Sequence, residues 1–319
     1  MIALILVGGF GTRLRPLTCT RPKQLLPLGS STLIEYMITR LANQGVKEII
    51  LAVGYRPDRL QNALGDGKDL GVTLHYSLEE KPLGTAGPIK QAEAYLRGKG
   101  EFLVLNGDIV SDMNYQQFLE QHRNKEATAS IALYYVENPS RYGVVDRAAD
   151  GRIRSFVEKP PAGSAPSNLI NAGCYVLDES VLGYIPTGKR VSIEREIFPL
   201  LCENSDVFGW EHKGLWIDTG TPTSYLEANN AVLATALNET TETMISALSK
   251  DTSIHLTAPV FVGQGTTIGS SSDIGPNVTI GRDVIVGRNT QIRNTIIFDD
   301  AVISDGVVLE EVVIGQGAT

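Results

Sequence analysis

The hydrophobic pattern of the first 125 residues alternates between short apolar runs and helical spacing. Apolar runs with the length of buried strands occupy residues 2–7, 48–53, 72–76 and 102–105. Helical spacing predicts helices that begin after Thr32 and cover residues 56–64, 85–96 and 115–125, with Thr32 and Glu35 at capping-box spacing. Strands that alternate with helices in this way indicate an α/β fold with a parallel sheet and helices on both faces.

After residue 125 the pattern changes to extended runs separated by turn residues. These runs cover residues 130–136, 143–146, 152–157 and 170–177, and they predict an antiparallel or mixed extension of the sheet. A last helix is expected over residues 221–236. We therefore expect one α/β domain over residues 1–236, followed by a polar linker over residues 237–252.

From Leu256 onward the apolar residues repeat every six positions. One row comprises Leu256, Val262, Ile268, Ile274, Ile280, Val286, Ile292 and Phe298. A second row, two residues earlier, includes Val260, Val278, Val284, Ile296, Val302, Val308 and Ile314. This period matches the hexapeptide left-handed parallel β-helix, in which three hexapeptides form one triangular coil. We expect residues 253–319 to form such a domain, with a weaker fit after Phe298, where Ser304 takes a core position, and with a last coil that needs a cap or partner.

Composition and charge exclude several function classes. The net charge of −8 argues against nucleic acid or an anionic membrane surface as the main partner. No apolar run approaches the ~18 residues of a membrane span, and Met1 leads directly into a strand without a leader pattern, so we expect a cytoplasmic protein. The three cysteines and four histidines are scattered without metal-ligand spacing, so we expect neither disulfides nor a zinc site.

A glycine-rich turn with cations follows the first predicted strand. Its glycines are Gly8, Gly9 and Gly11, and the cations after them are Arg13, Arg15, Arg21 and Lys23. The first acidic residue is Glu35, although the chain has 36 acidic residues. The turn lacks the spacings of a P-loop and of a dinucleotide-binding turn. Its backbone N–H groups and its freedom from acids favour a phosphate site, with a purely structural turn as the alternative.

The residues around this turn carry a family resemblance. The string Gly8-Gly-Phe-Gly-Thr-Arg-Leu-Arg-Pro-Leu-Thr18, followed by Pro22-Lys23, resembles the signature of the sugar-1-phosphate nucleotidylyltransferases. The resemblance implies a Rossmann-like mixed, mostly parallel sheet and nucleotidyl transfer from a nucleoside triphosphate to a sugar 1-phosphate. It also implies nucleotide contacts from Leu6, Gly8, Gly9, Gly11, Thr12, Arg13, Lys23, Gly84, Thr85 and Gly107.

Catalysis of this transfer requires cations, because an anionic oxygen attacks an anionic phosphorus. Arg13 and Lys23 are the best candidates for the triphosphate and the transition state, whereas Arg15 and Arg21 fit solvated surface cations equally well. Asp108 directly follows a strand, and a carboxylate at that edge suits Mg²⁺. The resemblance assigns Asp108 and Asp218 to the metal, with a turn-forming role as the alternative for each.

The remaining matches concern the sugar phosphate. Glu158 and Lys159 lie in a Phe-Val-Glu-Lys-Pro string that the family uses for sugar-phosphate recognition, although an isolated Glu-Lys pair is usually a surface ion pair. The resemblance also implies sugar contacts from Gly143, Asn171 and Gly173.

Within the family, residues 79–87, 156–160 and 216–222 most resemble guanylyltransferases that act on mannose 1-phosphate and carry a C-terminal β-helix. This resemblance implies that GTP and mannose 1-phosphate give GDP-mannose and pyrophosphate with Mg²⁺, and we expect a homo-oligomer, dimer or higher, that involves the β-helix. Other sugar-1-phosphate nucleotidylyltransferases stay open, using UTP or dTTP with glucose 1-phosphate or GTP with a heptose 1-phosphate. A regulatory paralogue without activity also stays open, as does a hexapeptide acyltransferase. Such acyltransferases commonly use a catalytic histidine on the coils, and the only histidine near the repeats is His255.

Overall fold

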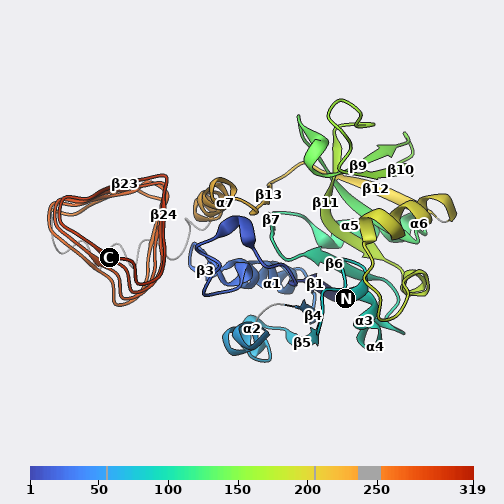
Figure 1. Cartoon of the computed structure of the whole chain (residues 1–319), viewed down its shortest axis with the longest axis horizontal. Helices are drawn as coiled ribbons and strands as arrows, with labels where there is room; N and C mark the ends of the chain where they lie inside the picture. The colour runs from blue at the N-terminus through green and yellow to red at the C-terminus, as the bar shows by residue number, and fades with distance from the viewer. Residues whose placement is uncertain (55–56, 205, 236–252) are drawn as a thin grey trace. The chain divides into compact units, whose positions relative to one another are not determined.

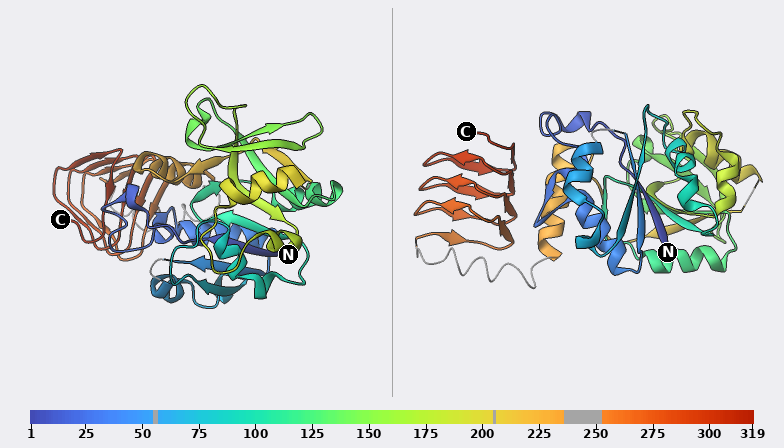
Figure 2. Two further views of the ribbon diagram at one scale, coloured as in Figure 1. Left: turned by 45° about the vertical axis from the view of Figure 1, so that its right-hand side comes forward. Right: turned by 90° about the horizontal axis from the view of Figure 1, so that it is seen from below.

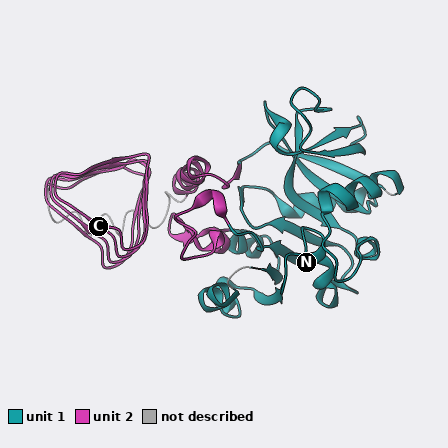
Figure 3. Ribbon diagram, in the orientation of Figure 1, with its two compact units in different colours: residues 1–10, 37–216 teal, residues 11–36, 217–319 magenta. Residues whose placement is uncertain are grey.

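The computed structural model describes residues 1–54, 57–204, 206–235 and 253–319. These residues form two compact units, each made of two stretches that are separated in the sequence (Figure 3). Unit 1 contains Met1–Phe10 and Met37–Trp216, and unit 2 contains Gly11–Tyr36 and Ile217–Thr319. The predicted linker over residues 237–252 lies outside the described residues.

A nine-stranded mixed sheet forms the centre of unit 1 (Figure 1). Its main path is β10 (Ile153–Glu158), β9 (Gly143–Arg147), β11 (Leu169–Leu177), β6 (Phe102–Asn106), β1 (Ile2–Leu6), β4 (Glu48–Val53) and β5 (Thr73–Leu78). In addition, β8 (Ala129–Tyr135) pairs with β11 and with the edge strand β12 (Val207–His212). The strands β1, β4, β5 and β6 are mutually parallel, whereas β11 is antiparallel to β6, β8 and β9. The predicted parallel half and its antiparallel extension are both confirmed.

Helices of unit 1 pack on this sheet through apolar faces. They are α2 (Pro57–Leu64), α3 (Gly87–Gln91), α4 (Glu93–Leu96), α5 (Tyr115–Asn124) and α6 (Phe198–Asn204), and α1 (Leu33–Asn43) has its larger part in this unit. The core cluster joins residues of α3, α4 and α6 to β1, β4, β6 and β8. No described helix is long and apolar enough to cross a membrane.

One predicted helix, over residues 85–96, is wrong in its extent. Residues 84–86 form a bridge and a turn instead, with Gly84 at a φ of +82°, where Ala86 N–H donates to the Val191 carbonyl at 3.0 Å and Val191 N–H donates to the Leu83 carbonyl at 2.9 Å. The helix therefore begins at Gly87, with Pro88 in its first turn, and Ala92 separates it from α4. This pairing partner lies about a hundred residues away in the chain, so the local pattern gave no sign of it.

The N-terminal part of unit 2 packs on a long helix. The short strands β2 (Pro27–Leu28) and β3 (Ser31–Thr32) form a hairpin, and α7 (Pro222–Thr235) lies against it. Gly29 N–H donates to Asn229 Oδ1 at 3.0 Å, and the fully buried Tyr225 donates its hydroxyl to the Pro27 carbonyl. The helix thus fixes the end of the cation-rich segment.

The C-terminal part of unit 2 is the predicted β-helix, with three parallel sheets around an apolar core (Figure 1). One sheet contains β14 (His255–Leu256), β17 (Asp273–Ile274), β20 (Gln291–Arg293) and β23 (Val308–Glu310). The second contains β15 (Val260–Val262), β18 (Val278–Ile280), β21 (Thr295–Ile297) and β24 (Val313–Ile314), and the third β16 (Thr267–Ile268), β19 (Ile285–Val286) and β22 (Val302–Ile303). The coils stack as parallel rungs (Figure 2).

The six-residue register is wrong after Ile292. Paired residues Val260 and Val278 are 18 positions apart, whereas the next pair, Val278 and Thr295, are 17 apart. This coil is therefore one residue shorter, and the core position predicted for Phe298 belongs to Ile297.

The shift explains the weak fit of the last coil. The core continues with Ile303 instead of Ser304, which is exposed. The predicted row positions Val302 and Val308 are 38% and 64% exposed. The repeat itself continues, displaced by one residue.

Candidate functional site

The carboxyl ends of β1 and β6 lie against each other in unit 1. Gly107 N–H donates to the Leu6 carbonyl at 3.0 Å. A Cβ on Gly107 would stand 2.7 Å from that carbonyl oxygen and 2.8 Å from Val7 Cγ1, so only glycine permits this approach. The start of the glycine-rich turn and the Asn106-Gly107-Asp108 segment are thereby neighbours, as expected for ligand-binding edges of parallel strands.

A half-buried carboxylate, Glu79, faces the glycine-rich turn. Its Oε1 lies 2.9 Å from the point where a Cβ on Gly8 would stand, and its Oε2 accepts the Leu83 N–H at 3.0 Å. Burial raises the pKa of this carboxyl, more than the Leu83 hydrogen bond lowers it. An ionised Glu79 carboxylate can only accept hydrogen bonds, so it would pair with hydrogen-bond donors of a ligand near the turn.

The predicted nucleobase segment is tied to a distant acid. Thr85 Oγ1 donates to Glu194 Oε2 at 2.5 Å, and it accepts the Ile193 N–H at 2.9 Å. Ser192 Oγ donates to the same carboxylate oxygen at 2.7 Å. Glu194 lies in a π-helical turn, Ile193–Ile197, a geometry that is frequent at functional sites. The Thr85 side chain is therefore engaged with protein groups.

The Asn171-Ala172-Gly173 segment interrupts the ladder between β11 and β8. Gly173 has a φ of +71°, and a Cβ there would stand 2.6 Å from Asn106 Nδ2. Asn171 donates from Nδ2 to the Tyr175 hydroxyl at 2.8 Å and accepts the Gly173 N–H at 2.9 Å. The bulge is thus shaped by internal bonds and lies directly against the segment that carries Asp108.

Glu158 is the last residue of β10, and Lys159 follows it. Strand β10 pairs with β9, which in turn pairs with β11, the strand that contains the bulge. The Glu158 side chain is 16% exposed and the Lys159 side chain 58%, with 3.6 Å between Glu158 Oε1 and Lys159 Nζ. Burial, together with the negative charge of Glu194, raises the pKa of Glu158. Glu158 Oε2 lies 2.8 Å from the point where a Cβ on Gly143 would stand. Three of the predicted sugar-phosphate residues are therefore close neighbours.

In unit 2, Lys23 is not a solvated surface cation. Its residue is 6% exposed, and its Cβ lies 3.2 Å from the Cβ position of Gly11. Thr18 donates from Oγ1 to the Gly11 carbonyl at 2.7 Å, which holds the turn over the lysine stem. The surface-cation alternative that the sequence allowed for Lys23 is therefore wrong.

Arg13 and Asp218, also of unit 2, converge on Gly220. Arg13 Nη2 and Asp218 Oδ1 each lie 2.9 Å from the point where a Cβ on Gly220 would stand. Arg13 is exposed and belongs to the 3₁₀ turn Thr12–Leu14, while Asp218 ends β13 (Trp216–Asp218). A predicted catalytic cation and a predicted metal ligand are therefore brought together.

A metal centre built by protein ligands alone is not present among the described residues, since no three His, Cys, Asp or Glu side chains gather there. Asp108 and Asp218 supply oxygen donors only. Each of these carboxylates is a ligand of the kind that suits Mg²⁺, which typically takes one or two carboxylates and completes its shell with substrate phosphates and water.

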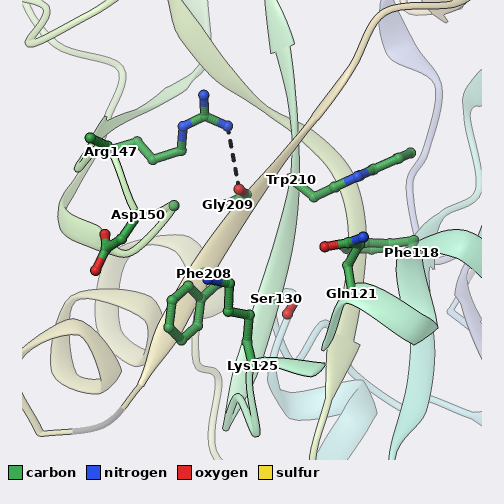
Figure 4. Close-up of a pocket in the computed structure, with 11 residues that line it drawn as sticks. Phe118, Gln121, Lys125, Ser130, Arg147, Asp150, Phe208, Gly209 and Trp210 are labelled. Atoms are coloured by element: carbon green, nitrogen blue, oxygen red, sulfur yellow. Dashed lines mark hydrogen bonds between the residues drawn. The ribbon is translucent and has the colours of Figure 1, made fainter. Parts of the chain in front are cut away.

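A separate pocket of about 210 Å³ lies beside the first residues of β8 and the first half of β12 (Figure 4). Its walls include Phe118 and Lys125 of α5, and Phe208 and Trp210 of β12. Arg147 donates to the Gly209 carbonyl at 3.4 Å beside it. The predicted site residues, all of which are described, do not line this pocket.

Three residues escaped the sequence reasoning: Glu79, Asn106 and Glu194. Glu79 begins the 79–87 string and Asn106 directly precedes Gly107, so their places in the sequence were an available signal. Glu194 is more than a hundred residues from Thr85 and carries no local signal of its role.

Comparison with known proteins agrees with this arrangement. Residues 2–235 match the nucleotidyl transferase family model, and residues 256–319 match the GMPPB C-terminal domain model. A mannose-1-phosphate guanyltransferase from Debaryomyces hansenii is 42% identical over 75% of this chain and 66% of its own length. The mannose-1-phosphate guanylyltransferase catalytic subunit beta of Drosophila pseudoobscura pseudoobscura is 42% identical over 70% of this chain and 60% of its own length. The matched part of the chain thus spans less than two thirds of each of these relatives.

Two solved structures have the same fold. A putative glucose-1-phosphate thymidylyltransferase from Bacillus anthracis, in complex with a sucrose, superposes with a TM-score of 0.66 at 26% identity, covering 73% of this chain and 95% of the other. HddC from Yersinia pseudotuberculosis, complexed with GMP-PN, superposes with a TM-score of 0.62 at 29% identity, covering 72% of this chain and 98% of HddC.

Proposed function

Since the chain belongs to the nucleotidyl transferase family, we propose that it transfers a guanylyl group from GTP to mannose 1-phosphate. An oxygen of the sugar phosphate attacks the α-phosphorus of GTP, the bond from that phosphorus to the bridging β-oxygen breaks, and pyrophosphate leaves. The observation that carries the proposal is the close packing at Gly107 and Gly173, which gathers the turn, the Asp108 segment and the sugar bulge at one edge of the sheet.

Charge neutralisation is the task of Arg13 and Lys23. Both reacting partners are anions, so preorganised cations lower the barrier by stabilising charge that develops on the leaving pyrophosphate. The buried Lys23 provides a point charge and Arg13 a forked donor. The glycine N–H groups at positions 8, 9 and 11 complete the anion site.

Asp108 and Asp218 are the proposed ligands of Mg²⁺. The bound ion supplies positive charge next to the transferring phosphoryl group. The role of the two carboxylates is to hold it, and the Arg13 guanidinium lies near Asp218, since Arg13 Nη2 and Asp218 Oδ1 are each 2.9 Å from the Cβ position of Gly220.

Lys159 and Glu158 receive the sugar phosphate. The exposed ammonium of Lys159 holds the attacking phosphate, while the half-buried Glu158 accepts hydrogen bonds from sugar hydroxyls. Asn171 and Gly173 define the wall of this subsite through the bulge.

Glu79 selects the base in this proposal. Guanine presents N1–H and N2–H₂ as adjacent donors, and a carboxylate accepts both, whereas the corresponding edge of uracil or thymine offers a single donor. Glu79→Gln places a donor opposite the guanine amino group. We expect it to lower kcat/KM for GTP about 10-fold or more, in keeping with about 1.5–3 kcal/mol for a charged hydrogen bond, and to leave the KM for the sugar phosphate unchanged.

A pyrophosphate-release assay tests the function directly. The chain is incubated with each of GTP, UTP, dTTP, CTP and ATP, combined with mannose, glucose or heptose 1-phosphate, in the presence of Mg²⁺. Turnover confined to GTP and mannose 1-phosphate is the expected result. Turnover with another pair would replace the substrates but keep the reaction class, and tight GDP-mannose binding without any turnover would indicate a regulatory protein instead. Assembly through the β-helix stays a prediction.

A further inference from the structure

Arg21, two residues before Lys23, contacts the β-helix. Its guanidinium lies over the ring of Phe298, with 5.2 Å between Cζ and the ring centroid, and it donates to Gln316 Oε1. Gln316 in turn donates from Nε2 to Asp300 Oδ2 at 3.1 Å. Arg21 is half-buried, so it is not the solvated cation that its sequence alone permits.

The shortened coil places Phe298 where Arg21 meets it. Since Ile297 takes the core position, Phe298 lies outside the β-helix core cluster, yet it is only 1% exposed. A regular six-residue repeat would have directed this ring into the core. The missing residue in the coil therefore creates an aromatic surface for the arginine.

The surrounding contact is built as a buried layer. Thr279 and Ile296 occupy the middle of β18 and β21, facing away from the core, and are 1% and 0% exposed. Helix α7 covers them. Asn229 Oδ1 accepts from Thr279 Oγ1 at 2.8 Å and from Gly29 N–H at 3.0 Å, so one carboxamide joins the β-helix to the cation-rich segment.

We propose that Arg21 is a positioning residue through which the β-helix sets the location of Lys23 and hence the rate of nucleotidyl transfer. Only Pro22 separates the two residues, and its φ of −57° is held by the ring. A displacement of Arg21 therefore reaches Lys23 across about 7 Å of stiff chain. The inference rests on the proposed function, because Lys23 is given its role there.

The test compares variants on both sides of the contact. Arg21→Met keeps the aliphatic stem and loses the guanidinium, Phe298→Leu removes the ring, and Gln316→Ala removes the acceptor at an exposed position. Arg288→Met is the control, since Arg288 is an exposed β-helix arginine whose guanidinium pairs with Asp305 at 2.9 Å. Each variant is assayed for kcat, for KM of both substrates and for Tm.

We expect Arg21→Met and Phe298→Leu each to lower kcat about 10-fold, because small displacements of a catalytic group cost up to about 10²-fold. The KM for the sugar phosphate stays within about twofold, the double variant is no slower than the slower single variant, and the control retains wild-type kcat. Arg21→Lys restores part of the rate, because an ammonium group also binds over the ring.

Unchanged kcat in Arg21→Met and Gln316→Ala overturns the inference, as does a loss of rate that only follows the fall in Tm. If the wild-type chain shows no turnover, the proposed function fails, and the inference is then tested by calorimetry with magnesium pyrophosphate. Arg21→Met should weaken that binding, and equal affinity in the variant and the wild type refutes the inference by itself.

Discussion

Gly107→Ala changes a position where the segment after β6 packs tightly against the end of β1. The new methyl group would stand 2.7 Å from the Leu6 carbonyl oxygen and 2.8 Å from Val7 Cγ1, whereas ordinary contacts begin at 3.4 Å. The Asp108 segment must therefore retreat from the turn by about 0.7 Å, the difference between these contact distances.

A shift of this size has two expected consequences. Overpacking of a dense core destabilises the fold by about 1–3 kcal/mol. Because a displacement of 1 Å in catalytic groups costs up to about 10²-fold in rate, kcat should fall by roughly 10- to 100-fold even in fully folded enzyme.

The measurement pairs pyrophosphate release with thermal unfolding, and Gly183→Ala is the matched control. Gly183 has no heavy atom within 4 Å of its Cβ position, so its substitution should leave kcat unchanged and the stability equal or up to about 1 kcal/mol higher. If Gly107→Ala retains wild-type kcat at a temperature well below its Tm, the close approach does not position the catalytic segments and our reasoning is refuted.

Three further substitutions test single roles. Lys23→Ala should lower kcat about 10²- to 10³-fold, by analogy with the loss of one preorganised donor, and a smaller loss in single-turnover assays would remove the lysine from the transition state. Asp218→Asn should raise the Mg²⁺ concentration needed for half-maximal rate, and an unchanged metal titration would contradict its role as ligand. Glu158→Gln tests the electrostatics of the sugar subsite: because burial and Glu194 raise the folded-state pKa of Glu158 above its ordinary 4.5, the wild type loses a stabilising contribution as the pH rises from 4.5 through that folded-state pKa. The Tm of the variant relative to the wild type should therefore increase with pH over this window and show no such trend below it, and a constant Tm difference would argue against the burial of this charge.

Local pattern was sufficient where one segment determines its own structure. The apolar run that became β4 was predicted with its observed bounds, Glu48–Val53, because a strand buried on both faces reads as a continuous apolar run. The glycine-rich turn and its cations were identified in the same way, since their residues are consecutive in the chain.

Prediction was wrong or silent where a distant segment decides the outcome. The turn at Thr85 and Ala86 is bonded to Val191 and Glu194, and the predicted helix begins only at Gly87, after these bonds. The sequence favoured a ligand role for Lys23 and left Arg21 equally compatible with a solvated surface cation, and only the structure shows the burial of the lysine and the contact of the arginine with Phe298.

The sequence by itself determined the α/β sheet, the β-helix and the family, because hydrophobic period and consecutive motif residues are local properties of the chain. Tertiary structure decided which residues meet: that Glu79 faces the turn, that Asn106 lies against the bulge at Gly173, and that a coil one residue short turns Phe298 toward Arg21. The physical reason is that these contacts depend on close packing between segments far apart in the chain, where shifts below 1 Å or of one residue in register change the partner.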